Sequence, residues 1–352
     1  MGVKFIHTAD LHLERDDPFR LDILSWILSK TEQVADALII AGDLFESDIE
    51  ASFLREKVRK IFEKAEKSLV LILPGNHDYL SYSPEINYGE RVILLNNAPS
   101  RINLKGVEIV GIPFHPQLEF SQCIEELKSK PDVVIAHGTL YDRNSPDIYV
   151  ELGDEAKYMP IYRWDVKDRM RYLALGHYHS RLTHLSFGET QVVYPGSPVA
   201  TSRRSIGQRF IVLVSFDSKG QVKIEKIPVD ICPYWERIEW MVFPGKEEEK
   251  LEEIEQQIKK IADKKVMLDG RVKGSIKISE AEFKERIKKI EGKYRSSFKN
   301  IHLSCEIRYW AHILQNPILK LFVEKLKDIG GDEQIKEKAL ELTLSALERL
   351  RG

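Results

Sequence analysis

The sequence has few cysteines, no excess of charge of one sign and no long apolar run, and each shortage excludes a class of protein. Three cysteines occur in 352 residues, too far apart for a disulfide framework or for the close pairs of a zinc knuckle. We therefore expect a protein of the reducing cytoplasm. The formal net charge of −2 gives no overall basic signature of nucleic-acid binding, so any contact with phosphates must depend on local side chains or metals.

The apolar runs are too short to cross a membrane, and the amino terminus lacks the pattern of a signal peptide. We therefore expect no membrane segment. The composition, 43% apolar and 31% charged, is typical of a soluble globular protein. A chain of 352 residues is long enough for a large core and for more than one domain.

The alternation of strand-like and helix-like segments up to about residue 230 is typical of an α/β layered domain. Apolar residues at helical spacing predict helices over 18–35 and 51–67. This mixed order predicts two packed sheets flanked by helices, because the later strands follow one another without a helix. Those later strand-like segments are 182–187, 191–194, 209–216 and 222–229.

The chain changes character at Cys232-Pro233, so we assign residues 1–232 to the first domain. We expect a smaller α+β domain over 233–312. Residues 313–352 carry two amphipathic helices, which either pack on their own domain or bind a partner. The expected elements are a helix over 246–262, a strand pair over 266–278, a helix over 281–290, a strand over 300–309 and terminal helices over 317–329 and 333–350.

Five strand-like runs of the first domain each end in side chains that can bind a metal. Runs rich in valine, isoleucine and leucine predict strands covered on both faces, and sites form where the loops from their carboxyl ends meet. Mixed oxygen and imidazole donors suit manganese, iron or zinc better than calcium or magnesium. The candidate ligands behind these runs are Asp10, His12, Asp43, Asn76, His137, His177 and His179.

Hydrolysis of a phosphodiester is the chemistry that such a set supports. Two divalent ions about 3.5–4 Å apart can neutralise the phosphate and generate hydroxide near neutral pH. Asp43, which follows a strand and a glycine, is the natural bridge between them. His77 is adjacent to Asn76 and points elsewhere, so we assign it as general acid or oxyanion stabiliser, with Asp78 orienting its ring.

Each motif alone also has a structural explanation, because a lone histidine near a strand end is more often a hydrogen-bonded residue than a ligand. Five of the ten histidines fall in these motifs, mostly beside a glycine that lets backbone come close. That coincidence argues against a purely structural explanation of the whole set.

The order D-x-H, G-D, G-N-H-D, H-G and G-H-x-H over residues 10–179 resembles that of the calcineurin-like metallophosphoesterase superfamily. Residues 7–13, 42–45 and 194–198 resemble one branch more closely, the SbcD-type nuclease subunit of the double-strand-break repair complex. The resemblance implies a two-sheet calcineurin-like sandwich followed by a capping domain that contacts DNA and by terminal helices.

The resemblance also implies a site, an activity and partners. The activity is manganese-dependent 3′-to-5′ exonuclease and single-strand endonuclease action on DNA, with His77 as a catalytic residue that binds no metal. The partners are an SbcC-type coiled-coil ATPase, for which the helices over 313–352 are the candidate binding element, and a second copy in a two-fold dimer, for which residues 19–28 are a candidate. One manganese ion would be held by Asp10, His12, Asp43 and His179, and the other by Asp43, Asn76, His137 and His177.

Two residues depart from the pattern of this branch. Glu14 stands where glycine is usual, and Glu46 stands where some members carry a histidine associated with activity. These departures bear on the strength or mode of exonuclease action and leave the set of metal ligands complete.

Arginines and aromatic residues are mixed over residues 139–171. Such a mixture at the rim of a site suits contacts with the DNA backbone and base stacking, or it anchors a long loop to the core. The candidate DNA-contacting residues are Arg143, Arg163, Arg169, Arg203 and Arg204.

Two other functions stay open beside the nuclease. A small-molecule phosphodiesterase or phosphatase would use the same site, although it needs no extra domain from residue 234 onward. A non-catalytic scaffold of phosphoesterase shape would have lost ligands or the catalytic histidine, whereas here the ligand positions and His77 are all present.

Overall fold

The computed structural model describes residues 2–83, 85–200, 205–217, 219–309 and 317–328, and some residues between 335 and 346. The chain divides into two units between Cys232 and Pro233. The expected boundary between residues 312 and 313 and much of the helix expected over 333–350 lie outside the described residues, so both stay predictions, whereas the helix expected over 317–329 is present as α9 (Pro317–Asp328).

The first sheet of the first unit has six strands in the order β14-β13-β1-β2-β3-β4. Strands β1 to β4 pair in parallel, whereas β13 and β14 form an antiparallel edge. The strands are β1 (Lys4–Thr8), β2 (Ala37–Ala41), β3 (Leu69–Leu73), β4 (Val92–Leu94), β13 (Phe210–Phe216) and β14 (Val222–Pro228).

The second sheet also has six strands, in the order β11-β12-β10-β7-β6-β5. Its central strands β12, β10, β7 and β6 pair in parallel, and both edges are antiparallel. The strands are β5 (Ser100–Leu104), β6 (Val107–Ile112), β7 (Val133–His137), β10 (Tyr172–Gly176), β11 (Thr183–Phe187) and β12 (Thr190–Tyr194).

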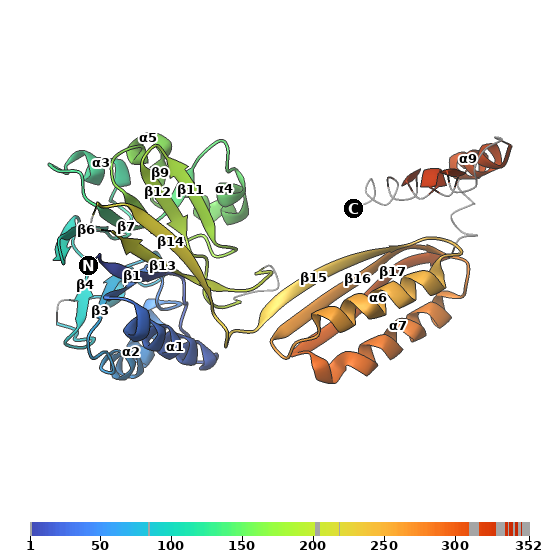
Figure 1. The fold of residues 1–352 in the computed structure, drawn as a ribbon, viewed down its shortest axis with the longest axis horizontal. Helices are drawn as coiled ribbons and strands as arrows, with labels where there is room; N and C mark the ends of the chain where they lie inside the picture. Colours follow the sequence, from blue (N-terminus) through green and yellow to red (C-terminus); the bar gives the residue numbers. More distant parts are fainter. Residues whose placement is uncertain are drawn as a thin grey trace. The chain divides into compact units, whose positions relative to one another are not determined.

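The two sheets pack face to face, and helices lie on both outer sides (Figure 1). In β1, Phe5 packs between the sheets and Ile6 packs under helices, because successive side chains of a strand point to opposite faces. The predicted α/β sandwich of two sheets flanked by helices is confirmed. The helices are α1 (Phe19–Val34) and α2 (Asp48–Phe62) on the first sheet, and α3 (Phe120–Glu125), α4 (Asp147–Leu152) and α5 (Arg163–Val166) beside the second.

The region over 139–171 has more regular structure than a plain loop. Strands β8 (Thr139–Tyr141) and β9 (Pro160–Tyr162) form a small parallel sheet, with α4 and the 3₁₀ helix η2 (Gly153–Lys157) between them. Another 3₁₀ helix, η1 (Tyr79–Ser81), follows β3.

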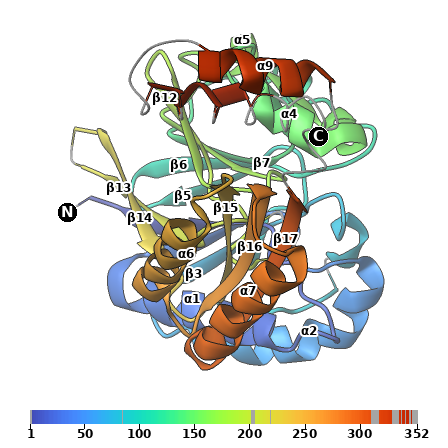
Figure 2. The ribbon, with the colours of Figure 1, turned by 90° about the vertical axis from the view of Figure 1, so that its right-hand side faces the viewer.

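The second unit is a three-stranded sheet in the order β15-β16-β17, with helices α6 and α7 on one face (Figures 1 and 2). Both strand pairs are parallel, and each connection between them contains a helix. Trp240, Ile254 and Phe283 are among the buried residues between sheet and helices. The elements are β15 (Tyr234–Val242), α6 (Glu247–Ile261), β16 (Val266–Ile276), α7 (Glu280–Tyr294), η3 (Arg295–Ser297) and β17 (Asn300–Tyr309), and later in the chain α9 (Pro317–Asp328).

The strand pair predicted over 266–278 is wrong. One strand, β16, runs through eleven residues, and it pairs with β17 and with β15, a strand that sequence reasoning did not identify. A glycine inside such a run suggests a turn between two strands, but Gly274 instead allows the backbone of the neighbouring strand to come close. Its φ is 122°, and a Cβ there would lie 2.2 Å from the carbonyl oxygen of Val242 in the neighbouring strand. Among the described residues, no helix is both long and apolar enough to cross a bilayer.

Replacing Gly274 with alanine is expected to destabilise the protein by about 2 kcal/mol or more, because a side chain there meets both an unfavourable φ and the Val242 carbonyl. Urea unfolding of the full chain measures the change. The matched control is Gly292→Ala in α7, where an added Cβ meets no atom within 4 Å and should stabilise by about 0.5–1 kcal/mol. Equal stability of Gly274→Ala and the wild type would contradict the packing described here.

Candidate metal centre

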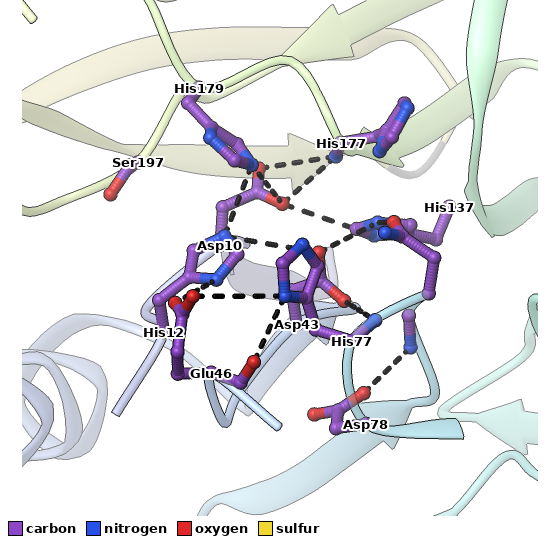
Figure 3. Close-up of polar contacts among 12 residues, drawn as sticks. Asp10, His12, Asp43, Glu46, His77, Asp78, His137, His177, His179 and Ser197 are labelled. Atoms are coloured by element: carbon purple, nitrogen blue, oxygen red, sulfur yellow. Dashed lines mark hydrogen bonds and ion pairs between the residues drawn. The ribbon is translucent and has the colours of Figure 1, made fainter. Parts of the chain in front are cut away.

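Loops from both sheets bring the candidate ligands together at the carboxyl ends of β1, β2, β3, β7 and β10 (Figure 3). The ligands form two groups that share Asp43. Within each group, one ligand atom of every residue lies within 4.8 Å of a ligand atom of each of the others. Asn76 belongs with the second group, because its Oδ1 is 2.9 Å from Nε2 of His137. The first group is Asp10, His12, Asp43 and His179, and the second is Asp43, His137 and His177.

Two imidazoles of the second group are held with a free nitrogen toward the centre. Nδ1 of His137 lies 2.9 Å from the Ala41 carbonyl oxygen, and Nε2 of His177 lies 3.1 Å from the Glu155 carbonyl oxygen. A carbonyl oxygen only accepts, so these nitrogens carry the proton and the other nitrogen of each neutral ring has a lone pair. That lone pair belongs to Nε2 of His137, 3.2 Å from Oδ2 of Asp43, and to the buried Nδ1 of His177, which has no hydrogen-bond partner among the described residues.

His12 faces Asp43 from the other side, with its outer nitrogen at ion-pair distance from a carboxylate. Its Nδ1 lies 2.9 Å from Oε2 of Glu46, and its Nε2 lies 3.1 Å from Nε2 of His179 and 3.8 Å from Oδ2 of Asp43. Ligand atoms at right angles around an ion about 2.1 Å away are themselves about 3 Å apart. Lone pairs and carboxylate oxygens facing one another at these distances fit divalent cations between them.

The backbone is strained where it presents these ligands. Asp10, His12, Asp43 and His177 have φ values of 57°, 48°, 49° and 102°, in the region that favours glycine. Hydrogen bonds impose this conformation: Asp10 N donates to Gly42 O at 3.1 Å and His12 N to Asp43 O at 3.0 Å. Such strain persists only where surrounding structure over-determines it, and it gathers at functional sites.

Gly42 allows the closest approach within the cluster. A Cβ at this position would lie 1.9 Å from Nδ1 of His137, so any side chain would displace that imidazole. The glycine that precedes Asp43 therefore makes room for a ligand that comes from the other sheet.

The buried acids and imidazoles of the cluster shift one another's pKa values. Burial raises the pKa of Asp10 to about 6. Burial works against a charge on His137, but the neighbouring Asp43 carboxylate raises its pKa to about 9. Burial also opposes ionisation of Asp43, yet His137 and His12 hold its pKa well below the usual range. Burial and His137 lower the pKa of His177 to about 3. In the protein without cations, a second proton, on Nε2 of His137, thus compensates the Asp43 carboxylate, and the lone pair of Nε2 becomes available when a cation replaces that proton.

The predicted role of Asp78 as the partner that orients the His77 ring is wrong. Asp78 is fully buried, and burial raises its pKa to about 6. Its oxygens accept hydrogen bonds from Gly75 N at 2.9 Å, Phe45 N at 3.1 Å and Tyr82 Oη at 2.7 Å. The Asp78 carboxylate therefore joins the loop after β3 to the loop after β2. It does not reach the His77 ring, because the side chains of His77 and Asp78 point in different directions from the turn.

His77 is oriented by the main chain of Glu46. Its Nδ1 lies 2.9 Å from the Glu46 carbonyl oxygen, and its own N–H donates to Oδ1 of Asp43 at 2.9 Å. Its side chain is 26% exposed and lines a cavity of about 400 Å³ in front of the first group. The position next to the ligands and open to the cavity is the one expected for a residue that meets substrate.

Sequence reasoning missed two arginines that support the site. Arg20 lines the cavity beside Glu14, with Nη2 2.6 Å from Oε1 of Glu14, and it donates a short hydrogen bond to the His12 carbonyl. Arg209 is buried and donates to the carbonyl oxygens of His179 at 2.7 Å and Ser197 at 2.8 Å. An arginine at the start of an otherwise apolar strand run is the signal that could have identified Arg209.

Three of the five candidate DNA-contacting arginines are exposed residues of the region over 139–171, and none of the three lines the cavity described above. Arg163 lies with Nη1 3.8 Å from Oδ1 of Asp142 and with its guanidinium 5.2 Å from the centre of the Phe187 ring. Arg143 and Arg169 lie in turns. Arg203 and Arg204 lie outside the described residues.

Residues 3–181 match the family model described as calcineurin-like phosphoesterase. No curated protein matches the chain. Among solved structures, TT1561 of Thermus thermophilus is similar at 14% identity and a TM-score of 0.41, over 65% of this chain and 100% of that one. Purple acid phosphatase PPD1 from yellow lupin is similar at 12% identity and a TM-score of 0.43, over 66% of this chain and 52% of that one. Vps29 of Entamoeba histolytica complexed with zinc is similar at 14% identity and a TM-score of 0.30, over 64% of this chain and 99% of that one.

Metal binding is expected to strengthen as pH rises, because a cation must displace protons from its ligands. His137, with a pKa of about 9, carries a proton at pH 6 and loses it toward pH 9, so affinity should rise about tenfold per pH unit between these values. Calorimetric titration with Mn²⁺ in buffers of different ionisation enthalpy measures both the affinity and the protons released. Affinity that is independent of pH, with no proton release, would contradict the arrangement.

Proposed function

The chain belongs to the calcineurin-like phosphoesterase family, and from that membership and the geometry of its metal centre we propose that it is a two-metal DNA nuclease of the SbcD type. The observation that carries the proposal is the buried Asp43 carboxylate, which lies between two groups of imidazole and oxygen donors. His77, oriented beside them and open to the cavity, supplies the group that such hydrolysis needs beyond the metals.

The side chains divide the work of hydrolysis. When bound, two divalent cations, manganese in this proposal, neutralise the phosphate and lower the pKa of water. Asp43 and the other candidate ligands fix the two positions. Because Nδ1 of His77 donates its proton to the Glu46 carbonyl, Nε2 is the nitrogen left for the substrate, and when Nε2 also carries a proton it can stabilise charge on the phosphoryl group or transfer that proton to the leaving 3′ oxygen. Arg20 also lines the cavity, but Glu14 and Asp17 pair with its guanidinium, so it supports the loop of His12 rather than offering a free charge to the phosphate.

An exposed aromatic stack supports DNA as the substrate. The Trp164 ring is 70% exposed and stacks on Tyr162, with ring centres 4.6 Å apart and an angle of 9° between the planes. Tyr162 stacks in turn on Tyr141, whose hydroxyl donates to the carbonyl of Ala156, next to the residue that contacts His177. Aromatic faces close to a phosphodiesterase site suit unpaired bases, since every base can stack.

The partners and location belong to the same proposal. An SbcC-type ATPase would bind the helices over 313–352. A second copy would dock on the first unit, where Ile49 and Phe53 of α2 are 66% and 56% exposed. The earlier candidate, residues 19–28, is less suitable because Ile23, Leu24, Ile27 and Leu28 are buried in the unit's own core. A cytoplasmic location suits three cysteines that form no disulfide with one another.

His77→Ala is expected to keep both cations and to lose about 10²–10⁴-fold in hydrolysis, because it contacts substrate and not metal. His177→Ala, the matched variant, should lose one ion and hydrolysis together. Metal content and Mn²⁺-dependent nucleotide release from DNA are measured in parallel. A His77→Ala protein that lacks one ion would contradict the assignment.

The same assays separate the alternatives. Cleavage of a chromogenic diester without cleavage of DNA by the wild type would replace the nuclease with a small-molecule phosphodiesterase. Tight binding of two ions with no hydrolysis of either substrate would replace it with a scaffold.

Trp164→Ala is expected to raise KM for single-stranded DNA on the order of tenfold, because one stacking face is lost, and to leave cleavage of a chromogenic diester unchanged. Val150→Ala is the matched control, since Val150 is 68% exposed in the same region and is not part of the stack. Equal KM values for Trp164→Ala and Val150→Ala would exclude the aromatic stack from substrate binding.

A further inference from the structure

Glu46 contacts two residues of the candidate site through two different groups (Figure 3). Its carboxylate Oε2 lies 2.9 Å from Nδ1 of His12, and its main-chain oxygen lies 2.9 Å from Nδ1 of His77. The other carboxylate oxygen, Oε1, is 3.9 Å from the same nitrogen of His77. One residue thus holds a candidate ligand by its side chain and the candidate catalytic residue by its backbone.

The chain around Glu46 is fixed well enough to hold this position. Its N–H donates to the Leu13 carbonyl at 3.1 Å, and Leu13 N donates to the Leu44 carbonyl at 2.9 Å. Immediately after Glu46, Ser47 caps helix α2 by accepting from Glu50 N. The segment that carries Glu46 is therefore tied both to the segment that carries His12 and to the start of a helix.

The three candidate ligand imidazoles with a fixed outer nitrogen differ in what holds that nitrogen. His137 and His177 are held by neutral carbonyl groups of Ala41 and Glu155, whereas His12 is held by the anionic carboxylate of Glu46. A carboxylate behind a ligating imidazole fixes its tautomer and raises its basicity toward the metal.

The two groups also differ in their own charge. The first contains two carboxylates, Asp10 and Asp43, while the second combines Asp43 with the neutral amide of Asn76. The carboxylate of Glu46 adds a third negative charge beside the first group. It does not contact the imidazoles of the second group.

We propose that Glu46 is a positioning residue for His12 and makes the cation position of Asp10, His12, Asp43 and His179 the tighter of the two. Glu46 itself is not a ligand of that position. His12, Glu46 and His77 offer atoms within 4.8 Å of one another. Nδ1 of His77 donates to the main-chain oxygen of Glu46, and Nδ1 of His12 lies at ion-pair distance, 2.9 Å, from its carboxylate without forming a hydrogen bond, so these atoms contact Glu46 itself rather than a third cation site.

The proposal predicts an ordered filling of the two positions. The first Mn²⁺ equivalent should enter the position next to His12 and give the spectrum of an isolated ion. The second should enter beside His137 and convert that spectrum to the one of a coupled pair. Loss of the Glu46 charge should bring the two affinities closer together, so that the coupled spectrum appears from the first equivalent onward.

Mn²⁺ titration of the full chain by calorimetry and electron paramagnetic resonance tests this. In Glu46→Gln the tighter dissociation constant should increase about 10- to 100-fold while the weaker one changes little, because His12 loses its anionic partner and the backbone that holds His77 is kept. Glutamine still offers an acceptor oxygen, so Glu46→Ala should weaken the tighter position further. This graded order distinguishes orientation of His12 from a general loss of structure.

Glu155→Gln is the matched control. Glu155 lines the same cavity, and its contact with His177 runs through a main-chain oxygen that the substitution keeps. Glu155→Gln removes the same charge from the same cavity but breaks no contact with a ligand imidazole. Its effect on both dissociation constants should therefore be well below that of Glu46→Gln. If Glu46→Ala fails to fold, as thermal unfolding would reveal, the isosteric Glu46→Gln still decides.

Two outcomes overturn the proposal: unchanged constants in Glu46→Gln, or equal effects of Glu46→Gln and Glu155→Gln on both positions. The titrations contain no DNA, so they succeed or fail independently of the proposed nuclease activity.

Discussion

The carboxylate of Asp43 is the interaction on which the rest of the site depends. It is fully buried, and one of its oxygens accepts no hydrogen bond among the described residues while imidazole nitrogens of His12 and His137 face it. Lone pairs and a negative charge gathered in a fully buried cluster repel one another unless protons or cations lie between them. The cluster is therefore poorly suited to a purely structural role and well suited to metal.

The architecture serves to keep that unfavourable arrangement in place. Strands from two sheets end at the same edge, and backbone hydrogen bonds join the loop of Asp10 to the loop of Asp43. Ligands held at positive φ and the close approach at Gly42 add strain that a looser scaffold would release. Asp78 and Arg209, both buried, satisfy main-chain groups of the surrounding loops from behind.

The sequence was sufficient to identify which side chains meet, because each candidate ligand directly follows a recognisable strand and the carboxyl ends of such strands share an edge. The sequence was not sufficient to predict in which direction each side chain points. Asp78 follows His77 but points under the loop, and the contact of Glu46 with His12 joins residues whose orientation depends on the strained turns. The missed strand β15 and the misread β16 have a similar cause, since Gly274 serves a contact with Val242 that is distant in sequence.

The most direct test of the central claim is the position of cations around Asp43. Anomalous diffraction at the manganese edge from crystals soaked in Mn²⁺ should show two peaks about 3.5–4 Å apart, with one oxygen of Asp43 directed at each or shared between them. A single peak, or two peaks with the Asp43 carboxylate turned away from both, would contradict the account.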